Sequence, residues 1–170
     1  MRRPHAVRRR TPVLIGAALA AALHAGPSAA QSGPAYRFGL SIGGVSTLGV
    51  VLERVYDWGS FELMLGTWSF RDLSISAVHK QYPFGGQFEG IVGLGLWTVI
   101  AFPPDENVGL ALVARAPIGI QWRVADEQFA NLEVGINRAL AVRRTDPEDD
   151  TPLNRRLVPL PGVAYRWLTR

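Results

Sequence analysis

Very few residues in this chain have side chains suited to catalysis or metal binding. The 170 residues include three histidines, His5, His24 and His79, and no cysteine. His5 and His24 fall in an N-terminal segment that we expect to be removed. A site made of several histidines is therefore excluded, and a Ser-His-Asp triad would depend on His79. His79 stands in the stretch "AVHKQYP", and we interpret it as a packed or interfacial histidine.

Two further motifs could bind ligands but lack the spacing that binding needs. The acidic run "DPEDD", residues 146–150, could hold calcium, yet its carboxylates do not follow the pattern of a calcium-binding loop. The glycines of "IGGVSTLG" do not stand between a strand and a helix, as those of a phosphate-binding loop do. We interpret the first as a solvated acidic loop and the second as a tight hairpin. The sequence thus predicts no catalytic residue, no metal and no cofactor.

Charged residues instead stand within segments whose apolar residues recur at every second position. In "VGLALVARAPIGIQWRVAD", residues 108–126, the even-numbered positions from Val108 to Trp122 are all apolar. The odd-numbered positions are mostly small or polar and include Arg115. Because side chains alternate between the two faces of a strand, Arg115 and the apolar set must lie on opposite faces.

The same alternation places charged residues on the polar faces of the other segments. The resulting set comprises Arg37, Glu53, Glu62, Lys80, Glu89, Arg115, Glu133 and Arg166. Four of these residues are acids and four are bases, so they can neutralise one another in an interior where unpaired charges would be costly. We predict a charge network inside a small barrel, in which Glu89 or Glu133 faces Arg115.

Turn signals divide the chain into eight such segments. We predict strands at 36–43, 47–56, 61–70, 72–82, 88–101, 108–122, 129–143 and 158–168. Many of them exceed the usual strand of a soluble sandwich and match the roughly 9–11 residues that cross a bilayer at a tilt. The expected fold is all-β, an eight-stranded antiparallel up-and-down transmembrane β-barrel formed by one domain, residues 31–170.

The N-terminus has the organisation of a cleavable export signal. "MRRPHAVRRR" holds five arginines and no acid, and an apolar run and then small residues follow. This order is typical of a secretory signal peptide, here residues 1–30 with cleavage after Ala30. An uncleaved anchor helix is the alternative, although the apolar run is shorter than the roughly 20 residues of a spanning helix. Cleavage would leave 13 Lys+Arg against 14 Asp+Glu, a net charge of −1 in place of +4, so nucleic-acid binding loses its main support.

Aromatic residues and the last strand indicate a family. Several aromatic side chains fall near strand ends on the apolar face, as they do in an interfacial girdle. They are Tyr36, Tyr56, Phe61, Trp122, Tyr165 and Trp167. The segment "LPGVAYRWLTR" resembles the C-terminal β-signal of outer-membrane proteins, with Gly162, Tyr165 and Trp167 at the signal positions, although "LTR" follows the final aromatic residue. Together with "FGLSIGGVSTLGVVLERVY" and "ALVARAPIGIQWRV", this motif makes residues 36–168 resemble small outer-membrane β-barrels of the OmpA-like, porin-like superfamily.

The resemblance implies a Gram-negative envelope protein in the outer membrane with both termini in the periplasm. Its partners would be outer-membrane lipid, lipopolysaccharide and the barrel-assembly machinery. We expect a monomer with a side-chain-filled lumen and a structural or surface-interaction role, neither an enzyme nor a channel. The longest connection, 144–157, would then be external.

Two alternatives stay open. A lipid-modifying outer-membrane enzyme is one, because lipid A deacylases are small barrels with a His-x-Ser pair where this chain reads "HKQ". A soluble periplasmic carrier resembling a lipocalin is the other, and it would need an apolar lumen and a polar exterior.

Three residues do not fit the strand pattern. Pro117 cannot donate to a β-ladder, so we expect a bulge or a missing hydrogen bond near it. Arg54 and Arg138 fall on the apolar face, where a position at mid-bilayer would cost about 2–4 kcal/mol. We expect both arginines toward a rim of the barrel, with a local register shift as the alternative.

Overall fold

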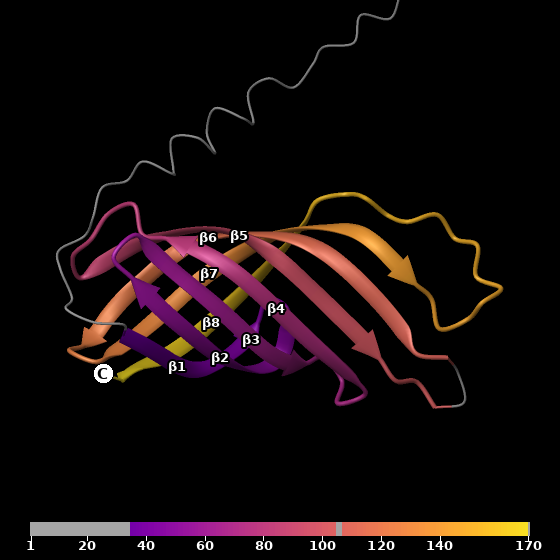
Figure 1. The fold of residues 1–170 in the computed structure, drawn as a ribbon, viewed down its shortest axis with the longest axis horizontal. Helices are drawn as coiled ribbons and strands as arrows, with labels where there is room; N and C mark the ends of the chain where they lie inside the picture. The colour runs from indigo at the N-terminus through magenta and orange to yellow at the C-terminus, as the bar shows by residue number, and fades with distance from the viewer. Residues whose placement is uncertain (1–34, 105–106, 170) are drawn as a thin grey trace, which may run out of the picture.

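Eight antiparallel strands form one closed barrel. The computed structural model describes residues 35–104 and 107–169, so the expected signal peptide, residues 1–30, lies outside the described residues. The strands are β1 (Ala35–Gly43), β2 (Ser46–Tyr56), β3 (Gly59–Thr67), β4 (Asp72–Gln81), β5 (Phe88–Ala101), β6 (Gly109–Ala125), β7 (Gln128–Arg143) and β8 (Val158–Thr169). Each strand pairs with the next, and β8 closes on β1. The all-β, eight-stranded, up-and-down fold is therefore confirmed (Figure 1).

Helices play no part in the described ranges. All eight elements there are strands. No helix in residues 35–104 or 107–169 is long and apolar enough to cross a membrane.

The two ends of the barrel differ. One, the terminus end, holds the start of β1, the end of β8 and the connections 57–58, 82–87 and 126–127. The other, the loop end, holds the connections 44–45, 68–71 and 144–157 and the described parts of the β5–β6 connection, 102–104 and 107–108. Figure 1 shows the long yellow-orange loop 144–157 at one end of the barrel and the C-terminus at the opposite end.

The wall of the barrel is taller on one side. β5, β6 and β7 have 14, 17 and 16 residues, and they extend past the other strands at the loop end (Figure 1). In the described part of the chain, β7 pairs with β8 only as far as Asn137, which lies opposite Val158. A register shift between Leu112 and Val113 makes Leu140 an extra residue in β7.

β3 ends three residues earlier than the sequence predicts. The expected strand reached Phe70, whereas β3 ends at Thr67 and a wider turn follows. The carboxylate of Asp72 accepts hydrogen bonds from the backbone N–H groups of Trp68 and Ser69, at 2.8 and 3.0 Å. The Phe70 N–H donates to the Thr67 hydroxyl at 2.8 Å, and Phe70 has a φ of 62°. These local side-chain bonds replace ladder bonds and stop the strand.

Pro117 interrupts the ladder as expected. On the β7 side, Pro117 pairs with Gly135. On the β5 side, no ladder pairs form between Val92–Ile118 and Gly95–Arg115, and the register is the same before and after this gap. The proline is therefore accommodated by missing ladder pairs and not by a bulge. A Cβ at Gly93 would lie 3.0 Å from the Pro117 ring, so a glycine there makes room for it.

Candidate functional site

The interior of the barrel is filled with charged groups. The buried ionisable side chains are Arg37, Glu53, Glu62, Lys80, Arg115, Glu133 and Arg166, each at most 7% exposed. Glu89, the eighth residue of the predicted network, is only partly buried. Alternation along each strand brings these residues inward, because their neighbours on both sides in sequence face outward.

Arg166 is the centre of this charge cluster. Its guanidinium contacts Glu53 at 2.9 Å and Glu133 at 3.2 Å, and it also donates to Glu62. Lys80 lies 2.8 Å from Glu62 and 2.5 Å from Glu133. Two cations thus connect all three buried carboxylates, which offsets the cost of burying them.

Polar and aromatic side chains fill the interior on the side of the terminus end. Glu53 accepts a hydrogen bond from the Ser60 hydroxyl at 2.5 Å and another from the Tyr82 hydroxyl. Arg37 lies 3.6 Å from Glu53, and its guanidinium stacks 4.3 Å above the Phe129 ring. Ser60 and Tyr82 were not among the predicted network residues, because neither carries a charge and Ser60 precedes the predicted strand 61–70, although β3 begins at Gly59.

The connection between β1 and β2 closes the interior on the side of the loop end. Gly43 and Gly44 both have positive φ, which permits the tight reversal. The Gly44 N–H donates to the Pro161 carbonyl at 2.7 Å, and the Ser74 hydroxyl donates to the Val45 carbonyl at 2.5 Å. Val45 is completely buried there.

An apolar layer lies beneath this connection. Val45 packs with Val51 and Met64, and Trp97 lies against the same cluster. The Trp97 indole N–H donates to the Ser74 hydroxyl at 2.6 Å. Side chains therefore occupy the interior from one end of the described barrel to the other.

The sequence suggests Glu89 or Glu133 as the partner of Arg115, and only Glu133 lies near it. Its Nη2 lies 4.0 Å from Glu133. Glu89 instead accepts from the Gln121 amide at 2.5 Å and lies 3.6 Å from Arg123, whose side chain is 46% exposed. Glu89 therefore belongs to the terminus-end rim and does not face Arg115.

His79 lies on the outer face near the terminus end. Its Nδ1 is 2.9 Å from the Ser60 carbonyl and its Nε2 is 2.9 Å from the Gln81 amide nitrogen. Because a carbonyl only accepts, Nδ1 must donate and Nε2 must accept. The Trp58 ring packs 5.1 Å from the imidazole. Both ring nitrogens are thus engaged in structural hydrogen bonds.

The aromatic residues of the predicted girdle gather at the terminus end. Trp167 stacks on Phe38 with ring centroids 5.5 Å apart, and Tyr165 lies 5.0 Å from Trp167. Gly162, the first residue of the predicted β-signal, pairs with Gly43 across the β1–β8 seam. Arg54 lies on the outer face among these rings, 5.7 Å from the centroid of Tyr36 and 5.0 Å from that of Tyr56.

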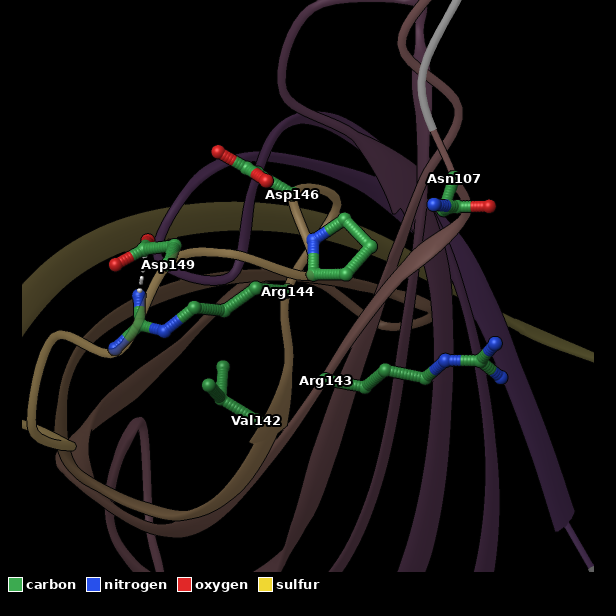
Figure 2. Close-up of a pocket in the computed structure, with 7 residues that line it drawn as sticks. Asn107, Val142, Arg143, Arg144, Asp146 and Asp149 are labelled. Atoms are coloured by element: carbon green, nitrogen blue, oxygen red, sulfur yellow. Dashed lines mark hydrogen bonds and ion pairs between the residues drawn. The ribbon is translucent and has the colours of Figure 1, made fainter.

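A pocket of about 430 Å³ lies outside the barrel at the loop end (Figure 2). Figure 2 shows Arg144 pointing toward Asp149, at 3.0 Å, while Arg143 points the opposite way. The Thr151 hydroxyl and N–H, together with Arg144, hold the pKa of Asp149 below its usual value. Arg144, at the base of the long loop, is therefore held to Asp149 in its first half.

No metal-binding cluster forms in the described ranges. There, no three side chains of His, Cys, Asp or Glu come close enough to share an ion. The backbone N–H of Glu148 donates to Asp146, and that of Thr151 donates to Asp149. The acids of "DPEDD" thus cap turns of the loop.

Comparison with known proteins adds no relative. No protein-family model, curated protein or solved structure matches the chain. Its function therefore has to be inferred from the barrel itself.

Proposed function

We propose that this chain is an integral outer-membrane β-barrel whose filled interior serves structure, and whose external loops make surface contacts. The observation that carries the proposal is the inverted distribution of side chains. Charged residues are buried, whereas large apolar residues of the wall face outward, among them Ile42 at 61% exposure, Leu94 at 55% and Ile118 at 57%. Extended apolar surfaces of this kind are typical of contact with lipid.

The dimensions of the wall support a bilayer environment. The strands have 9 to 17 residues, enough for the roughly 9–11 that a tilted strand needs to cross the hydrocarbon. Closure of β8 on β1 leaves the sheet without an open edge along the ring, which lipid requires of a spanning sheet. In the proposed orientation the terminus end is periplasmic and its aromatic rings lie at the interface.

The two outward arginines fit this orientation. Arg54 lies among aromatic rings at the terminus end, and Arg138 is exposed on β7 between the barrel middle and the loop end. We expect Arg138 to reach toward outer headgroup phosphates, since it stands past Asn137, where the pairing with β8 begins. We therefore expect each arginine to lie toward a rim of the barrel, Arg54 at the terminus end and Arg138 at the loop end.

The closed interior argues against conduction. The charge cluster occupies the middle and the buried Val45 connection covers the loop end. An eight-stranded barrel has an interior that side chains fill. Stable ohmic channels from purified monomer in planar bilayers would contradict a filled interior.

The two alternatives have less support from the geometry. A carrier of apolar ligands needs an apolar cavity, whereas the interior of the described barrel holds seven buried charged side chains. A lipid-modifying enzyme would need His79 as a base, whereas both nitrogens of His79 are hydrogen-bonded to neighbouring groups. An altered lipid A profile after His79→Ala, in cells with a normal amount of folded barrel, would revive the enzyme hypothesis.

Membrane fractionation tests the main proposal. We expect the protein to stay in carbonate-washed outer membranes and to migrate differently on a gel with and without heating, as folded barrels do. Release by carbonate, or recovery in the soluble periplasm, would refute the proposal.

A further inference from the structure

The buried part of the charge cluster contains one more cation than carboxylates. The buried cations are Arg37, Lys80, Arg115 and Arg166, and the buried carboxylates are Glu53, Glu62 and Glu133. Glu89 does not restore the balance, because it lies at the terminus-end rim beside Arg123. Within the described residues, the interior therefore carries an excess of one positive charge.

The excess falls on Arg115. Its Nε and Nη1 have no hydrogen-bond partner among the described residues, although the side chain is only 3% exposed. Glu133, the one carboxylate among the described residues that comes within 4.0 Å of Arg115, already binds Lys80 and Arg166 through Oε1. A guanidinium stays protonated in proteins, so Arg115 cannot relieve this situation by losing its proton.

A small cavity adjoins the Arg115 guanidinium. Its volume is about 20 Å³, and its lining includes Ser41, Gly44 and Gly162 together with three charged residues, the cations Arg115 and Arg166 and the carboxylate Glu133. A cavity of roughly 10–15 Å³ is enough for one water-sized particle. Gly44 lies beside the guanidinium, because a Cβ built on it would be in ordinary van der Waals contact with Nη2 of Arg115, at 3.9 Å.

We propose that this cavity binds one small monovalent anion, a halide such as chloride, against the Arg115 guanidinium. The anion would neutralise the excess charge, which is costly to leave unpaired in an interior. The Ser41 hydroxyl can donate to it, since its only partner in the described structure is the weakly accepting Met64 sulfur at 3.5 Å. The proposal rests on the interior alone and does not depend on the membrane.

Anomalous diffraction with bromide tests the site directly. Crystals of the full mature protein grown with bromide should show an anomalous peak beside the guanidinium of Arg115. A cavity that holds only water gives no such peak, and that result would overturn the proposal.

Unfolding in different salts gives an independent test. Urea unfolding of the wild-type protein in detergent, followed by tryptophan fluorescence, should show greater stability in chloride than in gluconate at equal ionic strength. Above the dissociation constant, a tenfold rise in chloride should raise the folded-to-unfolded ratio by up to about tenfold. Equal midpoints in the two salts would overturn the proposal without any variant.

Two variants assign the effect to the residue. Arg115→Met should lose the chloride dependence, whereas Arg71→Met, which changes an exposed arginine in the β3–β4 turn, should retain it. An unaltered chloride dependence in Arg115→Met would refute this site. If Arg115→Met does not fold, the wild-type salt comparison and the bromide peak decide the question.

Discussion

Replacing Arg166 with methionine should be among the most destabilising single changes in the barrel interior. Arg166 lies within 3.2 Å of Glu53 and Glu133 and also contacts Glu62. Glu62 and Glu133 would keep Lys80 as a partner, at 2.8 and 2.5 Å. Glu53 would be left with Arg37 at 3.6 Å, so one carboxylate loses its close ion pair.

The expected loss follows from Glu53, which loses its close cation and keeps the hydrogen bonds of Ser60 and Tyr82 and the longer contact with Arg37. Removing one partner of a buried ion pair costs about 3–5 kcal/mol, which is roughly two to four powers of ten in the unfolding equilibrium. Arg123→Met is the matched control, because its contact with Glu89 is at 3.6 Å and its side chain is 46% exposed. We expect that change to cost less than about 1 kcal/mol.

Reversible urea unfolding in detergent, measured by tryptophan fluorescence, is the assay. The double variant Arg166→Met/Glu53→Gln should recover part of the loss, because the buried charge that has lost its close cation is then removed, with a coupling energy of about 0.5–3 kcal/mol. If Arg166→Met unfolds within about 1 kcal/mol of the wild type, or if the double variant shows no coupling, the charge cluster does not stabilise the barrel.

Three further predictions concern the seam, a turn and the long loop. Gly39→Ala should lower stability by about 1–3 kcal/mol, because its Cβ would collide with the Tyr165 carbonyl oxygen across the β1–β8 seam; an unchanged urea midpoint would show that the seam can relax. Phe70→Gly should raise stability by about 1 kcal/mol, since Phe70 has a φ of 62° and is 83% exposed; a lower midpoint would mean that the aromatic ring makes a stabilising contact. Protease added to intact cells should cut within residues 145–156 and leave the rest in the membrane, whereas cleavage only after the outer membrane is opened would contradict the proposed orientation.

The strands and their inward faces were predictable because the signal is local. Alternation in a single segment, such as 108–126, assigns Arg115 to one face and Ile118 to the other, and the structure places them so. The interruption at Pro117 was predictable for the same reason, since a missing N–H is a property of one residue. The end of β3 was not, because Thr67, Ser69 and Asp72 form a hydrogen-bonded turn whose strength no alternation reveals.

The partners of each charge were not predictable from the sequence. Glu89 and Glu133 both have the right parity to meet Arg115, but only Glu133 lies near it. The difference arises from the stagger of neighbouring strands, which sets the height of each residue along the barrel. That stagger is a property of the closed sheet and leaves no trace in the period of a single strand.

The sequence by itself determined an eight-stranded all-β fold with a charged face and an apolar face, because a period of two needs only neighbouring residues. Closure of the sheet decided which residues meet. It brings Arg166 to Glu53, 113 positions away, and it brings the Val45 carbonyl to the hydroxyl of Ser74. It also moves Glu89 to the rim and leaves Arg115 with an unbalanced charge beside a cavity. These contacts join residues far apart in the chain, and only the register of a closed barrel brings such residues together.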